Sequence, residues 1–244
     1  RLRERLLAAV QDSPAVAELA GNPMLLTILA IIGRRRELPR DRRSAYEHAV
    51  TVLVEHWDVN RHLRDEWTHT GTAFLDSRDK IELLHRVARG MQDAPTGLAG
   101  NHIPGPDLTE RFRDYLQEDV GLPRPQAISA ARAMLDQFRV RNFILARFGA
   151  EVYGFVHRAF LEYLAADDIN TRLNSRDLTE ADVLAVYDRH WNDPAWSEVL
   201  LLLTGMIPER FAMKAILNLL AIKPRWRLQA TRPQHLLLAL QAVA

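Results

Sequence analysis

The sequence of 244 residues contains no cysteine. Disulfide bridges and thiolate metal sites are therefore excluded, and nothing indicates secretion. Long apolar runs are missing too, since the run from Val199 to Leu203 is far shorter than the ~18 residues that a helix needs to span a bilayer. These absences predict a cytoplasmic protein that does not enter a membrane.

The sequence also lacks an excess of charge of either sign. Its 32 basic and 31 acidic residues nearly cancel, so the chain has no overall attraction to nucleic acid or to an anionic membrane. Arginines do crowd a short stretch around Leu38-Pro39, but Glu37 and Asp41 partly offset them and no aromatic residues are interleaved. These arginines are Arg34, Arg35, Arg36, Arg40, Arg42 and Arg43. Nucleic acid is therefore not an expected partner.

Motifs that would carry out chemistry are missing as well. The sequence has no phosphate-binding loop of the form Gly-x-x-x-x-Gly-Lys-[Ser/Thr], no apolar strand ending in paired acids to hold magnesium, and no Gly-x-Ser-x-Gly elbow. Several histidines fall in one region without the spacing of metal ligands. They are His48, His56, His62 and His69. No catalytic residue and no metal site are predicted.

What the sequence does contain is a succession of amphipathic helices. Apolar residues at helical spacing predict helices over 24–32, about 42–57, 77–92, 107–119 and 124–139. The first is apolar nearly all round, which predicts a buried helix. Asp41 or Ser44 is a candidate N-cap for the second, and Asp107-Leu108-Thr109-Glu110 has the form of a capping box for the fourth. Three prolines and three glycines predict a loop over 93–106, whereas residues 58–76 give no assignment.

A β-hairpin is predicted between two later segments, 141–148 and 151–156, which Gly149-Ala150 joins. A two-residue loop that begins with glycine is a strong hairpin signal, because glycine supplies the positive φ of a type II′ turn. His157 then stands at the junction with a further amphipathic helix. Helices before a lone hairpin and a helix after it outline a winged helix, in which the hairpin is the wing.

Beyond Leu173 the pattern is entirely helical. Thr179-Glu180-Ala181-Asp182 is predicted to cap one helix, and three more are predicted over 194–206, 208–221 and 233–244, each with proline at its start. Such a series suggests stacked helical hairpins. The predicted fold is therefore mainly α: a helical bundle and a winged helix with one β-hairpin, followed by stacked helical hairpins.

Two motifs resemble those of a known family. Residues 155–166, Phe-Val-His-Arg-Ala-Phe-Leu-Glu-Tyr-Leu-Ala-Ala, resemble the F-x-H-x-x-F-x-E-Y-L-A-A signature that closes the winged-helix domain of NACHT-type signal-transduction ATPases, the STAND class. Residues 21–30 are similar to the NP-L-L-L segment that ends the first helical domain of that family. The resemblance implies the end of a first helical domain over 1–36, a winged helix over 37–168, and a second helical domain or the start of helical repeats over 169–244.

The resemblance also implies a nucleotide site and a function. In the family, the histidine that matches His157 contacts the β-phosphate of ADP, and the proline that matches Pro23 packs on the adenine base. The chain would then be the regulatory switch segment of a NACHT/STAND NTPase in signal transduction or defence, which holds ADP in a closed state and opens for homo-oligomerisation. An upstream P-loop core in cis would bind ADP or ATP with magnesium, and downstream repeats would sense a ligand.

The missing Walker A and B motifs leave open whether this chain is itself an enzyme. Its first residue, Arg1, lies within an amphipathic segment, so we expect a piece of a longer protein whose hydrolytic core, an ATPase, lies upstream.

Each assignment has a structural alternative. His157 can serve as a cap or a packing residue at a helix start, and Pro23 suits a first helical turn, where its missing N–H would be unsatisfied anyway. For the whole chain, the alternatives are a DNA-binding winged-helix transcription regulator with a helical dimerisation domain and a purely structural helical adaptor. The candidate recognition helix, 124–139, carries few arginines among many alanines, which is typical of a packing helix.

Overall fold

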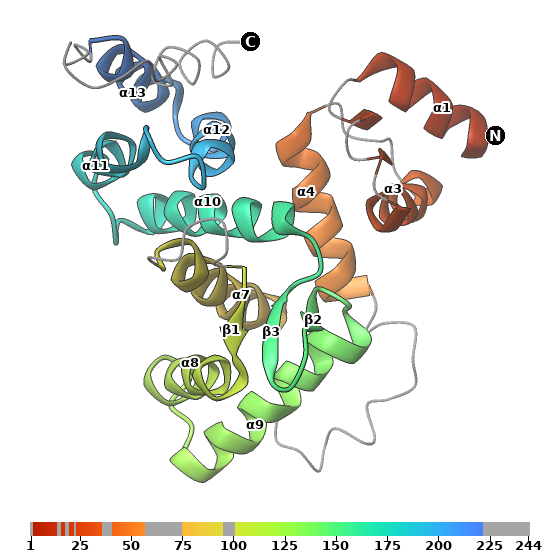
Figure 1. Cartoon of the computed structure of the whole chain (residues 1–244), viewed down its shortest axis with the longest axis vertical. Helices are drawn as coiled ribbons and strands as arrows, with labels where there is room; N and C mark the ends of the chain where they lie inside the picture. The colour runs from red at the N-terminus through yellow and green to blue at the C-terminus, as the bar shows by residue number, and fades with distance from the viewer. Residues whose placement is uncertain are drawn as a thin grey trace. The chain divides into compact units, whose positions relative to one another are not determined.

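The computed structural model describes residues 2–13, 16–17, 20–21, 23–35, 41–56, 75–94 and 101–221. The chain forms two compact units, the first from residues 1–84 and 102–160 and the second from residues 85–101 and 161–244. Two helices, α7 (Ser77–Gln92) and α10 (Arg158–Ser175), run from the first unit into the second (Figure 1). Several predictions lie outside the described residues: they concern the stretch around Leu38-Pro39, the end of the helix predicted to residue 57 and the helix over 233–244. The boundaries of the three predicted domains stay a prediction.

Helices that the structure describes open the first unit. They are α1 (Leu2–Asp12), α3 (Pro23–Arg35) and α4 (Arg42–Thr51), and α4 continues into the π-helix η1 (Val52–His56). α3 packs against both α1 and α4. The prediction that this helix is buried all round is wrong, because Leu26 is 38 % exposed and Thr27 is exposed, whereas Leu25, Ile28 and Ile32 are buried. Neighbouring helices bury one face of α3. The face with Leu26 and Thr27 stays exposed, although the helix is rich in apolar residues.

Of the two candidate N-caps of α4, Asp41 and Ser44, the structure selects Asp41. The carboxylate of Asp41 accepts hydrogen bonds from the backbone N–H and the hydroxyl of Ser44, each at 2.8 Å. Such a cap satisfies a backbone donor that has no partner within the helix. Tyr46 and Val50 are buried on the inner face, as their spacing predicts.

The order of the next elements is that of a winged helix, and the predicted fold is confirmed. They are α7, β1 (Ile103–Pro104), α8 (Gly105–Glu118), α9 (Arg124–Asp136), the π-helix η3 (Gln137–Arg141), β2 (Leu145–Arg147) and β3 (Val152–Phe155). α8 and α9 pack closely against each other, and the β2–β3 hairpin follows as the wing (Figure 1). The ring of Phe112 on α8 meets that of Phe138 edge-on at 5.7 Å, and both side chains are fully buried.

The sheet has three antiparallel strands in the order β1-β3-β2. The sequence predicts only the hairpin, and β1 falls where it predicts a loop. Ile103 lies opposite Tyr153 and Pro104 opposite Val152. A two-residue strand that contains proline has no pattern of its own, and Pro104 is tolerated because β1 is an edge strand. Pairing with β3 therefore creates this strand.

The hairpin itself differs from its prediction at both ends. Its loop has three residues, since the N–H of Phe148 bonds the carbonyl of Val152 at 2.7 Å and both Gly149 and Glu151 have positive φ, 82° and 108°. The first strand begins at Leu145 and not at 141, because the chain is still helical in η3 and Phe143 then has a φ of 52°. Non-glycine residues rarely adopt this conformation, and no sequence signal marks it.

The start of α8 is also different. The helix begins at Gly105, and Pro104 is its N-cap without a side-chain hydrogen bond. Asp107 therefore lies inside the first turn, and the predicted capping box there is wrong. Further along α8, the hydroxyl of Tyr115 donates to Asp79 on α7 at 2.7 Å. Burial, and then this hydrogen bond, raise the pKa of Tyr115, so the hydroxyl remains a donor at all physiological pH values.

Among its described residues, the second unit contains helices joined by turns and no strand. After α10 come α11 (Glu180–His190), α12 (Ser197–Met206) and α13 (Glu209–Ala221). α13 contacts both α11 and α12, as expected for stacked helical hairpins. The capping box of Thr179 and Asp182 at the start of α11 is confirmed. α12 begins at Ser197, three residues after its predicted start, because Pro194 to Trp196 form a turn.

Trp196 anchors this unit and is 1 % exposed. His190 stacks on it with ring centroids 3.9 Å apart, and Arg89 lies over the same ring at 5.4 Å. Burial lowers the pKa of His190, so the ring that stacks on Trp196 is neutral near pH 7.

Candidate functional site

His157 lies at the corner between β3 and α10. Its Nδ1 accepts a hydrogen bond from the backbone N–H of Ala159 at 3.2 Å, and its carbonyl accepts one from the N–H of Phe160 at 3.1 Å. The imidazole therefore caps the first turn of α10, which is the structural role considered for it from the sequence. Because Nδ1 is an acceptor, the proton of the neutral ring is assigned to Nε2.

The other ring nitrogen, Nε2, is available to donate a hydrogen bond to a ligand. Among the described residues, Nε2 of His157 has no hydrogen-bond partner, and the side chain is half-buried. A neutral imidazole held in this way presents one N–H donor in a fixed direction. Such a donor suits a negatively charged oxygen.

Buried aromatic residues hold this corner in place. Phe155 precedes His157 and Phe160 follows it, and they are 1 % and 0 % exposed. The ring of Tyr46 on α4 meets that of Phe160 edge-on at 6.4 Å. The N–H of Val156 also bonds the carbonyl of Ile144 at 3.1 Å. Packing on both sides therefore fixes the backbone at His157.

Pro23, the second predicted site residue, begins α3 and is exposed. Its carbonyl accepts a hydrogen bond from the hydroxyl of Thr27 at 2.9 Å. An exposed proline ring offers a flat apolar surface to a ligand. Helix α3, which begins at Pro23, packs on α4. On the same α4, Tyr46 contacts Phe160, which follows His157 by three residues. No direct contact joins Pro23 to His157 among the described residues.

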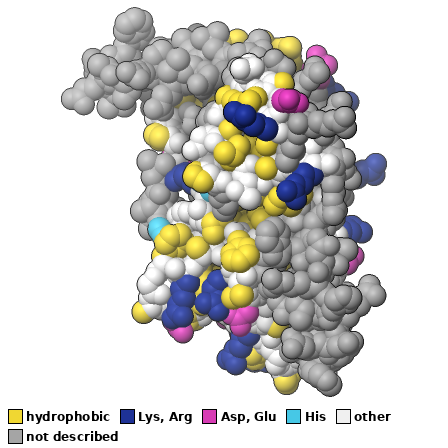
Figure 2. All heavy atoms as spheres, turned by 90° about the vertical axis from the view of Figure 1, so that its right-hand side faces the viewer, with side chains coloured by type: hydrophobic (Ala, Val, Ile, Leu, Met, Phe, Trp, Pro, Cys, Tyr) yellow, Lys and Arg dark blue, Asp and Glu magenta, His cyan; other side chains and the backbone are white. Residues whose placement is uncertain are grey.

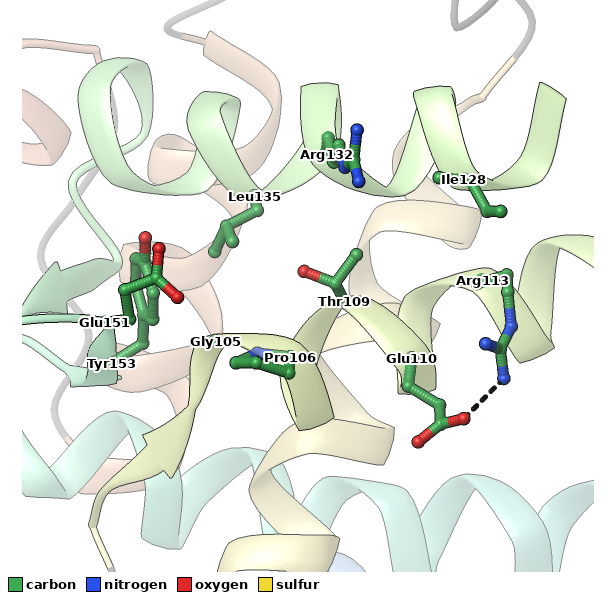
Figure 3. Close-up of a pocket in the computed structure, with 10 residues that line it drawn as sticks. All are labelled: Gly105, Pro106, Thr109, Glu110, Arg113, Ile128, Arg132, Leu135, Glu151 and Tyr153. Atoms are coloured by element: carbon green, nitrogen blue, oxygen red, sulfur yellow. Dashed lines mark hydrogen bonds and ion pairs between the residues drawn. The ribbon is translucent and has the colours of Figure 1, made fainter. Parts of the chain in front are cut away.

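A groove that the sequence does not predict lies between α8, α9 and the wing (Figure 3). It has a volume of about 580 Å³, within the range of ligand pockets. Apolar side chains of α9 and the ring of Tyr153 from β3 line it together with charged groups. The lining residues are Gly105, Pro106, Thr109, Glu110, Arg113, Ile128, Arg132, Leu135, Glu151 and Tyr153. Neither Pro23 nor His157 is among them.

The charges of this groove nearly balance. Arg113 donates to Glu110 at 2.8 Å and to Asp114 at 2.5 Å, and these carboxylates raise its pKa. Arg132 on α9 and Glu151 at the tip of the wing are exposed and add one charge of each sign. The groove therefore has no net attraction for an anion. Its residues come from three separate stretches of chain, so no local sequence pattern indicates it.

The charge pattern of α9 bears on the DNA-binding alternative. Its inner face is made of small buried residues such as Ala127 and Ala131. On its outer side, Arg139 of η3 is paired with Asp136 at 3.0 Å. Figure 2 shows one face of the molecule, on which the Lys and Arg side chains lie in separate places with apolar and acidic side chains between them. A continuous basic surface, which duplex DNA requires, is not seen among the coloured side chains.

A buried histidine in the second unit lies next to acidic side chains. His85 contacts Asp167 through Nε2 at 3.0 Å, and Asp168 is paired with Arg172 at 2.8 Å. His85 and Asp168 bring possible metal-ligand atoms within 4.8 Å of each other. Because Arg172 already neutralises Asp168, we assign these residues to the packing of α7 on α10. None of the described helices has the length and apolar character of a membrane span.

Comparison with known families agrees with the fold. Residues 42–169, more than half of the chain, match the family described as the winged helix-turn-helix domain C-terminal to NACHT. The chain belongs to this family. The resemblance seen in the sequence is therefore confirmed. Within the NACHT-associated winged helix, His157 lies inside the matched residues, whereas Pro23 lies before them. No curated protein and no solved structure matched the chain.

Proposed function

We propose that this NACHT-associated winged helix is the nucleotide-sensing switch segment of a NACHT/STAND NTPase. In this proposal His157 donates its Nε2–H to the β-phosphate of ADP, and the exposed ring of Pro23 covers one face of the adenine. The rest of the nucleotide site, with magnesium, belongs to a P-loop core in cis. The bound ADP supplies the negative charge that His157 recognises and undergoes no reaction on this chain.

One observation carries the proposal: the Nε2–H of His157 has no hydrogen-bond partner among the described residues, while Nδ1 of the same ring caps α10. A cap uses one nitrogen and leaves the other for a ligand. The contact need contribute only about 1–3 kcal/mol to act as a lock between a closed and an open state. When the contact is lost, the winged helix is released from the core, and the open form is free to assemble with other copies. The signalling and defence roles and the cytoplasmic location belong to the same proposal.

The alternative of a DNA-binding regulator is not favoured. The recognition helix α9 carries Arg124 and Arg132 and ends at Asp136, which is paired with Arg139 of η3. A DNA reader needs several unpaired cations aligned along a groove-facing surface.

Substitutions of His157 separate the cap from the phosphate contact. Aspartate caps helices well, so His157→Asp retains the acceptor for the N–H of Ala159 but places a carboxylate where the phosphate would lie. In the protein that joins this chain to its NACHT core, we expect His157→Ala to speed the release of a fluorescent ADP analogue by about 5- to 150-fold. His157→Asp should speed it at least as much.

The control is His102→Ala, which removes an exposed histidine whose ring meets that of Phe148 edge-on at 5.0 Å. This variant should release the analogue at the wild-type rate. If His157→Asp also keeps the wild-type release rate while His157→Ala only lowers stability, His157 is a helix cap and the switch proposal is wrong.

A further inference from the structure

The groove between α8, α9 and the wing is elongated. Its lining residues on α8 extend from Gly105 to Arg113, which is about 12 Å along a helix at 1.5 Å per residue. On α9 they extend from Ile128 to Leu135, which is about 10 Å. An extended chain advances about 3.3 Å per residue, so each wall matches about three to four residues of such a chain. The length of the groove therefore suits an extended peptide segment.

Two charged side chains of opposite sign are available in this groove. Within the part of the chain that the structure describes, the guanidinium of Arg132 and the carboxylate of Glu151 have no ion-pair or hydrogen-bond partner. Arg113 differs, because Glu110 and Asp114 already pair with it. An occupant with a single charge would leave one of the two available groups unpaired. The groove therefore favours an occupant that carries one negative and one positive group.

An apolar surface lies between these two charges. Figure 3 shows Leu135 projecting from α9 between Arg132 and the two wing residues Glu151 and Tyr153. In an extended segment, side chains at i, i+2 and i+4 face the same side. An acidic, an apolar and a basic residue at alternate positions would then meet the cation, the apolar surface and the carboxylate in turn.

Two hydroxyl groups of the groove are available to the backbone of such a segment. They belong to Thr109 on α8 and Tyr153 on β3, and neither has a hydrogen-bond partner among the described residues. Thr27 and Thr51 on other helices behave differently, since each donates to the carbonyl one turn earlier, at 2.9 Å and 2.8 Å. A hydroxyl both donates and accepts, so it suits the N–H and the C=O of a peptide alike.

We propose that this groove binds an extended segment of a partner protein with an acidic, an apolar and a basic residue at alternate positions. The acidic side chain pairs with Arg132, the apolar one packs on Leu135, and the basic one pairs with Glu151. The proposal goes beyond the nucleotide switch and does not depend on His157.

Binding of short peptides to the full chain tests this proposal. The probe is Glu-Thr-Leu-Thr-Lys with blocked ends and a neutral coumarin label, and binding is measured by fluorescence anisotropy. In a second probe, Lys-Thr-Leu-Thr-Lys, a base replaces the acid. We expect the wild-type chain to bind the first probe about five- to tenfold more tightly, because the second places a like charge opposite Arg132.

Charge reversal in the groove should reverse this preference. Arg132→Glu should bind Lys-Thr-Leu-Thr-Lys more tightly than Glu-Thr-Leu-Thr-Lys, which a general loss of folding does not produce. The matched control is Arg124→Glu, which makes the same change at an exposed position of α9 outside the groove. This control should keep the wild-type preference.

The opposite end of the groove is tested in the same way. Glu151→Lys should prefer a third probe, Glu-Thr-Leu-Thr-Glu, over Glu-Thr-Leu-Thr-Lys. Its control is Glu118→Lys, at an exposed position of α8 that does not line the groove. This control should again bind as the wild-type chain does.

Four results would overturn the proposal. The first is no binding of Glu-Thr-Leu-Thr-Lys to the wild-type chain at millimolar concentration, and the second is an unchanged preference in Arg132→Glu. The third is displacement of the probe by isocaproate, an apolar carboxylate without a cation, as efficiently as by unlabelled peptide, which would indicate a site for small carboxylates. The fourth is a wild-type dimer in sedimentation that Arg132→Glu converts to a monomer, which would mean that a second copy occupies the groove.

Discussion

Helices α8 and α11 begin with the same kind of sequence but start in different ways. Asp107-x-x-Glu110 and Thr179-x-x-Asp182 both have the form of a capping box. At α11 the box is formed, since Thr179 and Asp182 exchange hydrogen bonds between side chain and backbone. At α8 the helix begins at Gly105, two residues before the box, and its N-cap Pro104 makes no side-chain bond.

The difference arises from what precedes each helix. The residues before α8 form β1, whose pairing with β3 fixes the backbone up to Pro104. The N–H of Gly105 then donates to the carbonyl of Glu151 at 2.7 Å, which satisfies one helix donor from another part of the chain. Before α11 there is only a turn, so the side chains of the box determine the start. A capping pattern decides a helix start only where no long-range contact competes.

The largest loss of stability is expected at Gly105, where α8 lies closest to β3 and the wing loop. A methyl group at Gly105 would lie 2.9 Å from a ring carbon of Tyr153 and 3.4 Å from the carbonyl oxygen of Glu151. Gly105→Ala should therefore lower the free energy of unfolding by about 1–2 kcal/mol, as measured by urea denaturation. The matched control is Gly205→Ala in α12, where a methyl group meets nothing within 4 Å. Because alanine is the better helix former, this control should gain up to about 1 kcal/mol.

Removal of the capping box that is formed, at Thr179, should have the second largest effect on stability. Thr179→Ala deletes the side-chain acceptor for the N–H of Asp182 and the hydroxyl donor to its carboxylate. The expected loss is about 1 kcal/mol of unfolding free energy, and Thr179→Ser should restore most of it because serine keeps the hydroxyl. An unchanged urea midpoint for Thr179→Ala would mean that the box contributes nothing.

Removal of Asp107, which belongs to the capping box that is not formed, should change the free energy of unfolding very little. Asp107 lies in the first turn of α8, so Asp107→Ala removes only the interaction of a negative charge with the helix dipole. Its loss in urea denaturation should be less than half of that for Thr179→Ala. An equal loss would show that α8 starts at Asp107 in solution and that the two helices do not differ.

The smallest expected effect is the pH dependence of stability that Asp182 causes. Hydrogen bonds from the hydroxyl and backbone N–H of Thr179 hold the pKa of Asp182 below its ordinary value. A lowered carboxyl pKa stabilises the folded state fully above the ordinary value of about 4, and this contribution is lost as the pH falls through the lowered folded pKa. Asp182→Asn should therefore be less stable than wild type by a constant amount between about pH 5 and 7.

Below about pH 4 the stability difference between Asp182→Asn and wild type should shrink. Thermal denaturation of both proteins across this range gives the measurement. A difference that persists unchanged down to about pH 2 would rule out the ionised carboxylate as its source.

Much of the fold follows from local patterns. The helical period over 77–92 predicts α7 with its observed bounds, and the hydrophobic stripe of α4 and its cap at Asp41 agree with the structure. The winged helix as a whole is predictable because a lone hairpin between helices has few other arrangements. The wing loop is not, since Glu151 adopts positive φ in a third loop residue that glycine-based turn rules do not anticipate.

The candidate site is predictable only in part. The motif around His157 identifies the residue and its place at the end of the wing. The sequence does not indicate which ring nitrogen caps α10, because that depends on the angle between β3 and the helix. The groove of Arg132 and Glu151 has no sequence signal at all, since α8, α9 and β3 meet there only after folding.

The sequence by itself determined the kinds of elements, their order, the position of His157 and the exclusion of disulfides. Those properties depend on the spacing of apolar residues and on side chains within one turn of each other. Tertiary structure alone decided where α8 begins and that Ile103 and Pro104 form a strand. The reason is that a backbone donor or acceptor takes the partner that folding brings nearest, and that partner lies far away in the sequence.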